Sequence, residues 1–280
     1  MRADYDAMCA GFAAPRPDRL TIKDTSIANG SHPLPVRWYQ PAGQPEDGPV
    51  MVYFHGGGFV VGGLDSHDSI VADIAAGAGL AVMAVDYALA PEYPFPAALE
   101  DALSAVRHIL RTGPDRPVLL AGDSAGAWLA ASVSHQVGRP EPRLAGQVLI
   151  YPTLGGDITT GSYKTHAHAP LLTTADILWY GQQFIGSDQP FRRVGPLCEA
   201  KFTDLPPTVI FAAACDPLYD DGPAYAKKLA AAGGQAWCQT EDGLVHGYLR
   251  GRRQVQKIAD SFERIIAACI ALKDGVWPYR

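Results

Sequence analysis

Residues 117–126, Pro117-Val118-Leu119-Leu120-Ala121-Gly122-Asp123-Ser124-Ala125-Gly126, decide the fold of this chain. An apolar run of strand type leads into the pattern G-x-S-x-G, and helix-forming residues follow from 127 to 133. A serine on so sharp a turn needs small neighbours, because bulky ones would collide with the adjoining strand and helix. Strand, tight turn and helix in this order indicate a nucleophile elbow, which lifts the serine hydroxyl out of a sheet. The pentapeptide alone leaves open a glycine-rich turn with an incidental serine.

A glycine-rich loop, His55-Gly56-Gly57-Gly58-Phe59, lies 69 residues before the serine and directly follows the apolar run 50–54. Glycines at the end of a strand leave backbone N–H groups uncovered, so such a loop can bind a developing oxyanion. A phosphate loop is excluded, because no Lys-Ser or Lys-Thr follows the glycines. The spacing G-x-G-x-x-G with a later acidic residue is also missing, which argues against a dinucleotide site.

An aspartate and a histidine follow the serine, each just beyond a predicted strand. The apolar run 208–214 ends before Asp216, and His246 comes 30 residues later, after a strand-like segment at 236–240. Serine, aspartate and histidine in this chain order are typical of an α/β-hydrolase triad and differ from the orders of chymotrypsin and subtilisin. The sequence therefore predicts Ser124 as nucleophile, His246 as base and Asp216 as the acid that orients the base.

Two neighbouring carboxylates compete with Asp216 for the acid position. Asp220 and Asp221 stand directly ahead of Gly222-Pro223. That position suits the N-cap of a helix with proline in its first turn. We therefore expect capping from this pair and the triad role from Asp216.

These motifs together resemble the hormone-sensitive-lipase-like family of α/β-hydrolase carboxylesterases. The resemblance covers residues 50–250 and includes His55-Gly56-Gly57-Gly58, the segment 86–98 and the loops around Asp216 and His246. It implies a serine carboxylesterase with an oxyanion hole made by the backbone N–H groups of Gly57, Gly58 and Ala125. The chain departs from the family pattern at Ala88, where arginine is usual, and at Ala127-Trp128, where Gly-Asn is usual. We expect Trp128 to fill core.

Predicted strands and helices alternate along most of the chain. A hairpin is expected from strands at 20–27 and 34–40, and the chain then alternates through strand 50–54, helix 66–78, strand 80–86, helix 97–111, strand 117–122, the elbow helix and strand 146–151. Alternation of this kind predicts an α/β fold with a mostly parallel central sheet and helices on both faces. It stops from about 152 to 205, where only helix 174–185 is evident, and resumes with strand 208–214 and a last helix near 252–272. We therefore expect one α/β-hydrolase domain over 1–280, with a small helical cap formed by residues 1–17 and 152–205.

Composition excludes several other classes of protein. The chain has 280 residues, 48% of them hydrophobic and 19% charged, and a formal net charge of −6. An acidic chain without basic runs is not expected to bind nucleic acid. No apolar stretch reaches the roughly 18 residues of a membrane span. Five scattered cysteines without a C-x-x-C pair suit free thiols, and the N-terminus lacks the apolar stretch of a secretory signal, so we expect a cytoplasmic protein.

The function that these residues predict is hydrolysis of small or short-chain acyl esters without a cofactor or metal. Aromatic residues Trp179, Tyr180 and Phe184 of the cap are expected to line a short pocket. The alternatives are an amidase-type hydrolase such as an arylformamidase, or a non-catalytic small-molecule receptor on the same fold. The last strand, near 236–240, is expected at a sheet edge, where it could pair in a homodimer.

Overall fold

The computed structural model describes residues 1–280 except for residues 31, 46, 114, 138–140, 187–190 and 280. In the described part, eight strands form one sheet: β1 (Leu20–Asn29), β2 (His32–Pro41), β3 (Val50–Phe54), β4 (Ala81–Val85), β5 (Val118–Asp123), β6 (Leu144–Ile150), β7 (Thr208–Cys215) and β8 (Ala236–Val245). The longer helices are α1 (Arg2–Gly11), α2 (Asp68–Ala78), α3 (Ala97–Thr112), α4 (Ala125–Gln136), α6 (Thr174–Ile185), α7 (Asp221–Ala231) and α8 (Gln256–Lys273). Short helical turns are α5 (Ser162–Thr165), η1 (Phe191–Val194), η2 (Pro196–Cys198) and η3 (Tyr248–Gly251).

The strand order places the ends of β3 and β5 side by side. The sheet runs β1-β2-β4-β3-β5-β6-β7-β8. Strand β2 pairs antiparallel with both β1 and β4, and the remaining pairs are parallel. After β3 the chain crosses to β4 on one side and then returns to β5 on the other. Ligands of open α/β sheets bind at such a switch point, beyond the carboxyl ends of the strands. Because Phe54 pairs with Gly122, the glycine-rich loop and the elbow leave the sheet together at this point.

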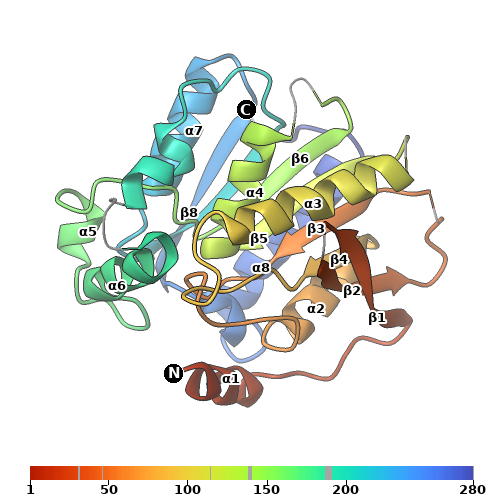
Figure 1. The fold of residues 1–280 in the computed structure, drawn as a ribbon, viewed down its shortest axis with the longest axis horizontal. Helices are drawn as coiled ribbons and strands as arrows, with labels where there is room; N and C mark the ends of the chain where they lie inside the picture. The colour runs from red at the N-terminus through yellow and green to blue at the C-terminus, as the bar shows by residue number, and fades with distance from the viewer. Residues whose placement is uncertain (31, 46, 114, 138–140, 187–190, 280) are drawn as a thin grey trace.

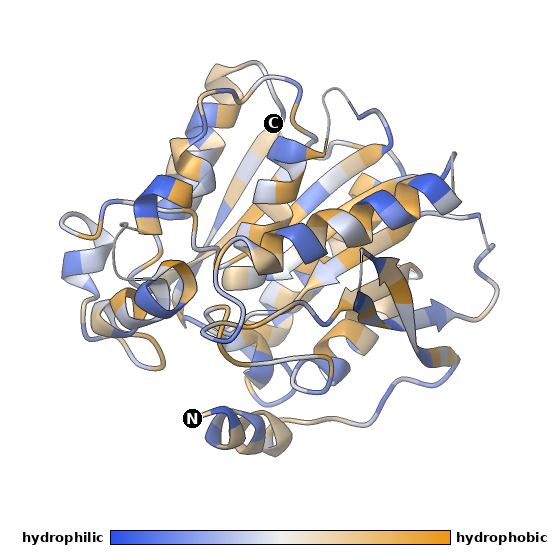
Figure 2. Ribbon diagram, in the orientation of Figure 1, coloured by the Kyte–Doolittle hydropathy of each residue, from blue (hydrophilic) through white to orange (hydrophobic). Residues whose placement is uncertain are grey.

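The sheet is buried on both faces, as its continuous apolar strands predict. Alternate residues of β3 point to opposite cores: Val52 and Phe54 pack with helices α3, α4 and α7, and Met51 and Tyr53 pack with α2 and α8. Helix α3 buries positions such as Leu99, Leu103, Val106 and Ile109, and it exposes its polar face, so blue and orange alternate along it in Figure 2. The expected α/β-hydrolase fold with helices on both faces is thus confirmed.

The segment between β6 and β7 leaves the sheet and carries the helical turns α5, η1 and η2 as well as helix α6. Figure 1 shows α5 and α6 together beyond the sheet, and α1 as a separate helix at the bottom of the view. Helix α6 begins at a capping box, in which Thr173 and Asp176 exchange hydrogen bonds, and it spans the predicted residues 174–185. None of the helices in the described ranges combines the length and apolar composition that a bilayer crossing requires.

Helix α4, which follows the elbow, packs so closely against β3 that the two backbones are in contact. A Cβ atom on Gly126 would stand 1.9 Å from the carbonyl oxygen of Phe54, and one on Gly122 would stand 2.4 Å from the carbonyl carbon of Gly126. Backbone atoms of a central strand cannot move aside, so only glycine fits these two positions. Trp128 follows two residues after Gly126 and has no exposed surface, which confirms the expectation that it fills core.

We predict that Gly126→Ala lowers the free energy of unfolding by about 3 kcal/mol or more, because the overlap is with backbone that cannot relax. Gly11→Ala is the matched control, since no heavy atom lies within 4 Å of the added Cβ. It should change stability by less than about 1 kcal/mol. Chemical denaturation of both variants measures the difference. Equal stability of the two variants would contradict the packing described here.

Candidate active site

Ser124 occupies the turn between β5 and α4 in a strained backbone conformation. Its φ of 54° and ψ of −117° lie outside the regions that a residue with a side chain prefers. The peptide is held in place by a hydrogen bond from Ser124 N to the carbonyl of Ile150 at 2.9 Å. The turn therefore has the nucleophile-elbow geometry that the sequence predicts.

His246 and Asp216 meet Ser124 at the carboxyl edge of the sheet. Asp216 follows β7 and His246 follows β8, and the two side chains come together although 29 residues separate them in sequence. His246 Nδ1 lies 2.6 Å from Asp216 Oδ2, and His246 Nε2 lies 2.8 Å from Ser124 Oγ. Asp216 is fully buried, and its other oxygen accepts a hydrogen bond from Leu218 N at 2.9 Å. With Nδ1–H donated to Asp216, Nε2 is an acceptor for the serine hydroxyl.

Asp220 and Asp221 fasten the cap to the loop that carries Asp216. The expectation that Asp220 caps α7 with its side chain is wrong: it stands at the N-cap position but accepts a hydrogen bond from Ser162 N at 2.8 Å instead. Asp221 is buried and accepts hydrogen bonds from Leu154 N (2.6 Å), Gly156 N (3.3 Å) and Tyr163 Oη (3.0 Å). These bonds satisfy amides at the base of the cap, which no sequence pattern had indicated.

Asp123 links the elbow to the glycine-rich loop. Its carboxylate accepts hydrogen bonds from Tyr53 Oη (2.8 Å), Gly56 N (2.9 Å), Tyr151 Oη (3.3 Å) and His67 Nε2 (3.3 Å). Burial by itself raises the pKa of Asp123, but His67, Arg250 and Tyr53 together hold that pKa below its usual range. The sequence placed Asp123 beside the nucleophile without showing that it organises this network.

The two histidines near this network are unsuited to proton transfer. Burial lowers the pKa of His55 to about 3 and also lowers the pKa of His67. His55 stacks on Tyr87, with ring centroids 4.3 Å apart, and its Nδ1 lies 2.8 Å from the carbonyl oxygen of Gly56. Both rings are therefore neutral and hold the loop in place.

The glycine-rich loop has backbone N–H groups without a hydrogen-bond acceptor among the described residues. Gly56 N donates to Asp123, and the Gly57 carbonyl accepts from Val60 N and Val61 N. The amides of Gly57 and Gly58 make no hydrogen bond within the described residues. Ala125 is the first residue of α4, so its N–H has no partner inside the helix. Gly57 has a φ of 132° and Gly58 a φ of 58°, a backbone that favours glycine.

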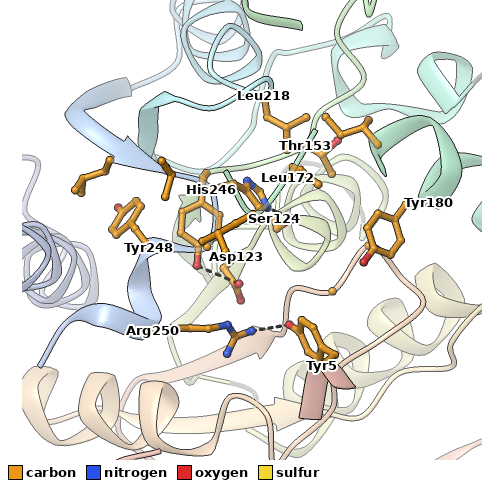
Figure 3. Close-up of a pocket in the computed structure, with 18 of the residues that line it drawn as sticks. Tyr5, Asp123, Ser124, Thr153, Leu172, Tyr180, Leu218, His246, Tyr248 and Arg250 are labelled. Atoms are coloured by element: carbon orange, nitrogen blue, oxygen red, sulfur yellow. Dashed lines mark hydrogen bonds between the residues drawn. The ribbon is translucent and has the colours of Figure 1, made fainter. Parts of the chain in front are cut away.

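A cavity of about 590 Å³ opens beside Ser124 and His246. Its walls come from α1, the glycine-rich loop, the cap and the segment after His246. Figure 3 shows Leu172, Leu218 and Thr153 on one side of the Ser124–His246 pair, and Tyr5 and Arg250 on the other. Most of the lining is apolar, as is usual for small-molecule sites.

The expected aromatic lining is only partly correct. Tyr180 lines the cavity. Phe184 instead belongs to the core and stacks on Phe59 with ring centroids 3.8 Å apart. Trp179 packs beside Tyr180 against Val60 and Val61. Tyr180 and Phe184 share one face of α6 but lie one turn apart along it, so Tyr180 reaches the cavity while Phe184 reaches the core. Within the described ranges, no group of three His, Cys, Asp or Glu side chains could hold a metal ion.

Comparisons with known proteins agree with this architecture. A family model described as alpha/beta hydrolase fold matches residues 51–250. Esterase LipI of Mycobacterium tuberculosis is 38% identical, over 82% of this chain and 75% of its own length. Ethyl acetate hydrolase of Pseudomonas putida is 34% identical, over 95% of this chain and 86% of its own length. The structure of an esterase from Pyrobaculum calidifontis superposes with a TM-score of 0.90 at 30% identity and covers 97% of this chain and 92% of that one.

The burial of Asp221 generates a prediction about how stability depends on pH. Burial raises the pKa of Asp221 to about 6, and the negative charge of Asp216 adds to this effect. An unfolded aspartate loses its proton near pH 4, so between about pH 4 and pH 6 the folded state binds more protons than the unfolded state. Ionisation of Asp221 in this window therefore destabilises the fold as pH rises.

We predict that the free energy of unfolding of the wild type, relative to Asp221→Asn, falls by up to about 3 kcal/mol from pH 4 to pH 6. The hydrogen bonds that the variant loses change its free energy of unfolding by an amount that does not depend on this titration. The test is therefore how the difference between the two proteins changes with pH. Urea denaturation of both proteins at several pH values measures it. If the difference in free energy of unfolding between wild type and variant stays constant or rises from pH 4 to pH 6, the raised pKa of Asp221 is contradicted.

Proposed function

Because this chain belongs to the hormone-sensitive-lipase-like family of α/β-hydrolases and is a carboxylic ester hydrolase, we propose that it cleaves short-chain esters with a Ser124-His246-Asp216 triad. The observation that carries the proposal is the continuous hydrogen-bond chain from Asp216 Oδ2 through both ring nitrogens of His246 to Ser124 Oγ. Nucleophile, base and orienting acid need this connection, since a serine hydroxyl is a weak nucleophile until a base takes its proton.

In the first step Ser124 Oγ attacks the ester carbonyl carbon while His246 Nε2 accepts the hydroxyl proton. Asp216 holds Nδ1–H, which fixes the tautomer and stabilises the imidazolium that forms. The tetrahedral intermediate then collapses, and Nε2–H passes its proton to the leaving alcohol. A water molecule, deprotonated in turn by Nε2, attacks the acyl-enzyme and releases the carboxylic acid and Ser124.

The negative charge on the carbonyl oxygen requires donors that are already in place. We assign them to the N–H groups of Gly57, Gly58 and Ala125. The hydrogen bond from Gly56 N to Asp123 supports this choice, because it uses the remaining glycine amide of the loop for positioning. Removing one oxyanion donor typically costs about 100- to 1000-fold in rate.

The test of this function is Ser124→Ala. The variant should retain the fold, since alanine removes only the hydroxyl, and should lose at least about 10⁴-fold of its activity on 4-nitrophenyl acetate. An active-site phosphonate should label Ser124 in the wild type and no residue in the variant. N-Formylkynurenine serves as the amide substrate in the same assay. Wild-type turnover by Ser124→Ala, or a preference for the amide, would overturn the proposal.

We further propose that the acyl part is short. On the cap side, the wall consists of Leu172, Ile177 and Leu218, which pack with Tyr163 in a buried apolar cluster. Asp220 and Asp221 tie this part of the cap to the sheet. An acyl chain gains about 0.8 kcal/mol per buried methylene until the space is filled, and after that it must displace packed side chains.

We predict that kcat/KM for 4-nitrophenyl esters is greatest between about two and six acyl carbons and falls at longer chains. The measurement is a homologous series from acetate to laurate below the solubility limit of each ester. A Leu218→Ala variant provides the comparison, because the added space should move the optimum to longer chains. An optimum at ten carbons or more in the wild type would show that the pocket is a lipase groove.

A further inference from the structure

Arg250 puts a positive charge into the wall of an otherwise apolar cavity. It is the one Lys or Arg among the lining residues in the described part of the chain. The guanidinium Nη1 donates to the carbonyl of Ser66 at 3.1 Å, and Nη2 donates to Tyr5 Oη at 2.5 Å. A guanidinium has five N–H donors, so these two bonds leave it with further donating capacity.

The neighbouring arginines are paired differently. Arg252 and Arg253 both form ion pairs with Asp73 at 2.6 Å. Among the described residues, no carboxylate lies within ion-pair distance of Arg250. A half-buried cation without a paired anion is costly, and binding of an anionic ligand group would offset that cost.

The charge of Asp123 acts on Arg250, but no hydrogen bond or ion pair joins the two side chains among the described residues. Its two oxygens are already surrounded by Tyr53, Gly56, Tyr151 and His67. The Asp123 charge therefore acts on Arg250 only through space. The guanidinium keeps its remaining donors for a group that enters the cavity.

Tyr5 of α1 completes the polar part of this wall. Its ring lies under the guanidinium, with Arg250 Cζ 5.1 Å from the ring centroid, and its hydroxyl accepts from Nη2. The stacking and the two hydrogen bonds hold the planar guanidinium in one orientation, which reduces the entropy lost when an anion binds. Figure 3 shows Tyr5 and Arg250 side by side, across the catalytic pair from Leu172 and Leu218.

We propose that the preferred substrates are esters that carry a carboxylate, which binds Arg250 while the apolar part of the ester lies against Leu172 and Leu218. This inference rests on the proposed esterase function and adds the charge of the substrate to it. Arg250 acts as a specificity-determining residue, because a carboxylate can take two parallel N–H bonds from a guanidinium. A neutral ester leaves those donors without a partner.

The experiment compares carboxylate esters with uncharged amides of the same shape. One arm carries the charge on the alcohol part, as 4-acetoxybenzoate against 4-acetoxybenzamide. The other carries it on the acyl part, as mono-4-nitrophenyl adipate against 4-nitrophenyl 5-carbamoylpentanoate. In at least one arm, kcat/KM should favour the carboxylate roughly 10- to 100-fold, mainly through KM, as expected for a charged hydrogen bond. The arm that responds identifies which part of the ester faces α1.

Arg250→Gln should lower this carboxylate-to-amide ratio at least about tenfold. The matched control is Arg253→Gln, which removes an arginine outside the cavity and should leave the ratio unchanged. Arg250→Lys keeps the charge without the planar fork and should give an intermediate ratio. If Arg250→Gln does not fold, the carboxylate-to-amide ratios of the wild type and of Arg250→Lys still test the inference.

Two results would overturn the inference. If the wild type hydrolyses the carboxamide-bearing esters as well as the carboxylate-bearing esters, it has no preference for an anion. The proposed esterase function then stands without this inference. An Arg250→Gln variant that loses activity equally on both substrates would show that Arg250 only balances Asp123 or anchors α1. Failure of the wild type to hydrolyse any of the four esters would instead remove the proposed function, and the inference with it.

Discussion

The contact between the elbow helix and the end of β3 is the constraint on which the rest of the site depends. Gly126 lies so close to the Phe54 carbonyl that no side chain fits between them. This approach brings the first turn of α4 beside the start of the glycine-rich loop. It also requires the sharp turn that gives Ser124 its positive φ. Packing density in the core and strain at the nucleophile therefore have one cause.

Buried charge connects this constraint to the surrounding loops. Asp123 is ionised in the interior because four donors surround it, and those donors come from β3, the glycine-rich loop, the residue after β6 and the start of α2. A carboxylate with this many partners ties their positions together more rigidly than apolar packing does. The charge of Arg250 also lowers the pKa of Asp123, although no hydrogen bond joins the two side chains. The charged groups around the glycine-rich loop thus include a cation in the cavity wall.

The cap is fixed to the rest of the fold both by apolar packing and by hydrogen bonds. Leu154, Phe184 and Phe202 join the main core, and polar contacts hold the cap to the loop after β7. Ser162 Oγ donates to the Pro217 carbonyl and accepts from Asp220 N, and Asp221 receives the amides of Leu154 and Gly156. These bonds converge on the loop that carries Asp216. The position of the cap and the position of Asp216 are consequently coupled through the same few contacts.

Sequence alone determined the strand-and-helix alternation, the elbow and the chain order of Ser124, Asp216 and His246. Apolar runs and glycine spacing are local signals, and the carboxyl ends of parallel strands meet at one edge of a sheet. Tertiary structure decided what depends on partners distant in sequence: Asp220 binds Ser162 instead of capping α7, Phe184 enters the core, and Gly56 N is taken by Asp123. Arg250 carried no sequence signal at all. Its neighbours Tyr5 and Ser66 lie 245 and 184 residues away along the chain, and only the folded chain brings them to the cavity.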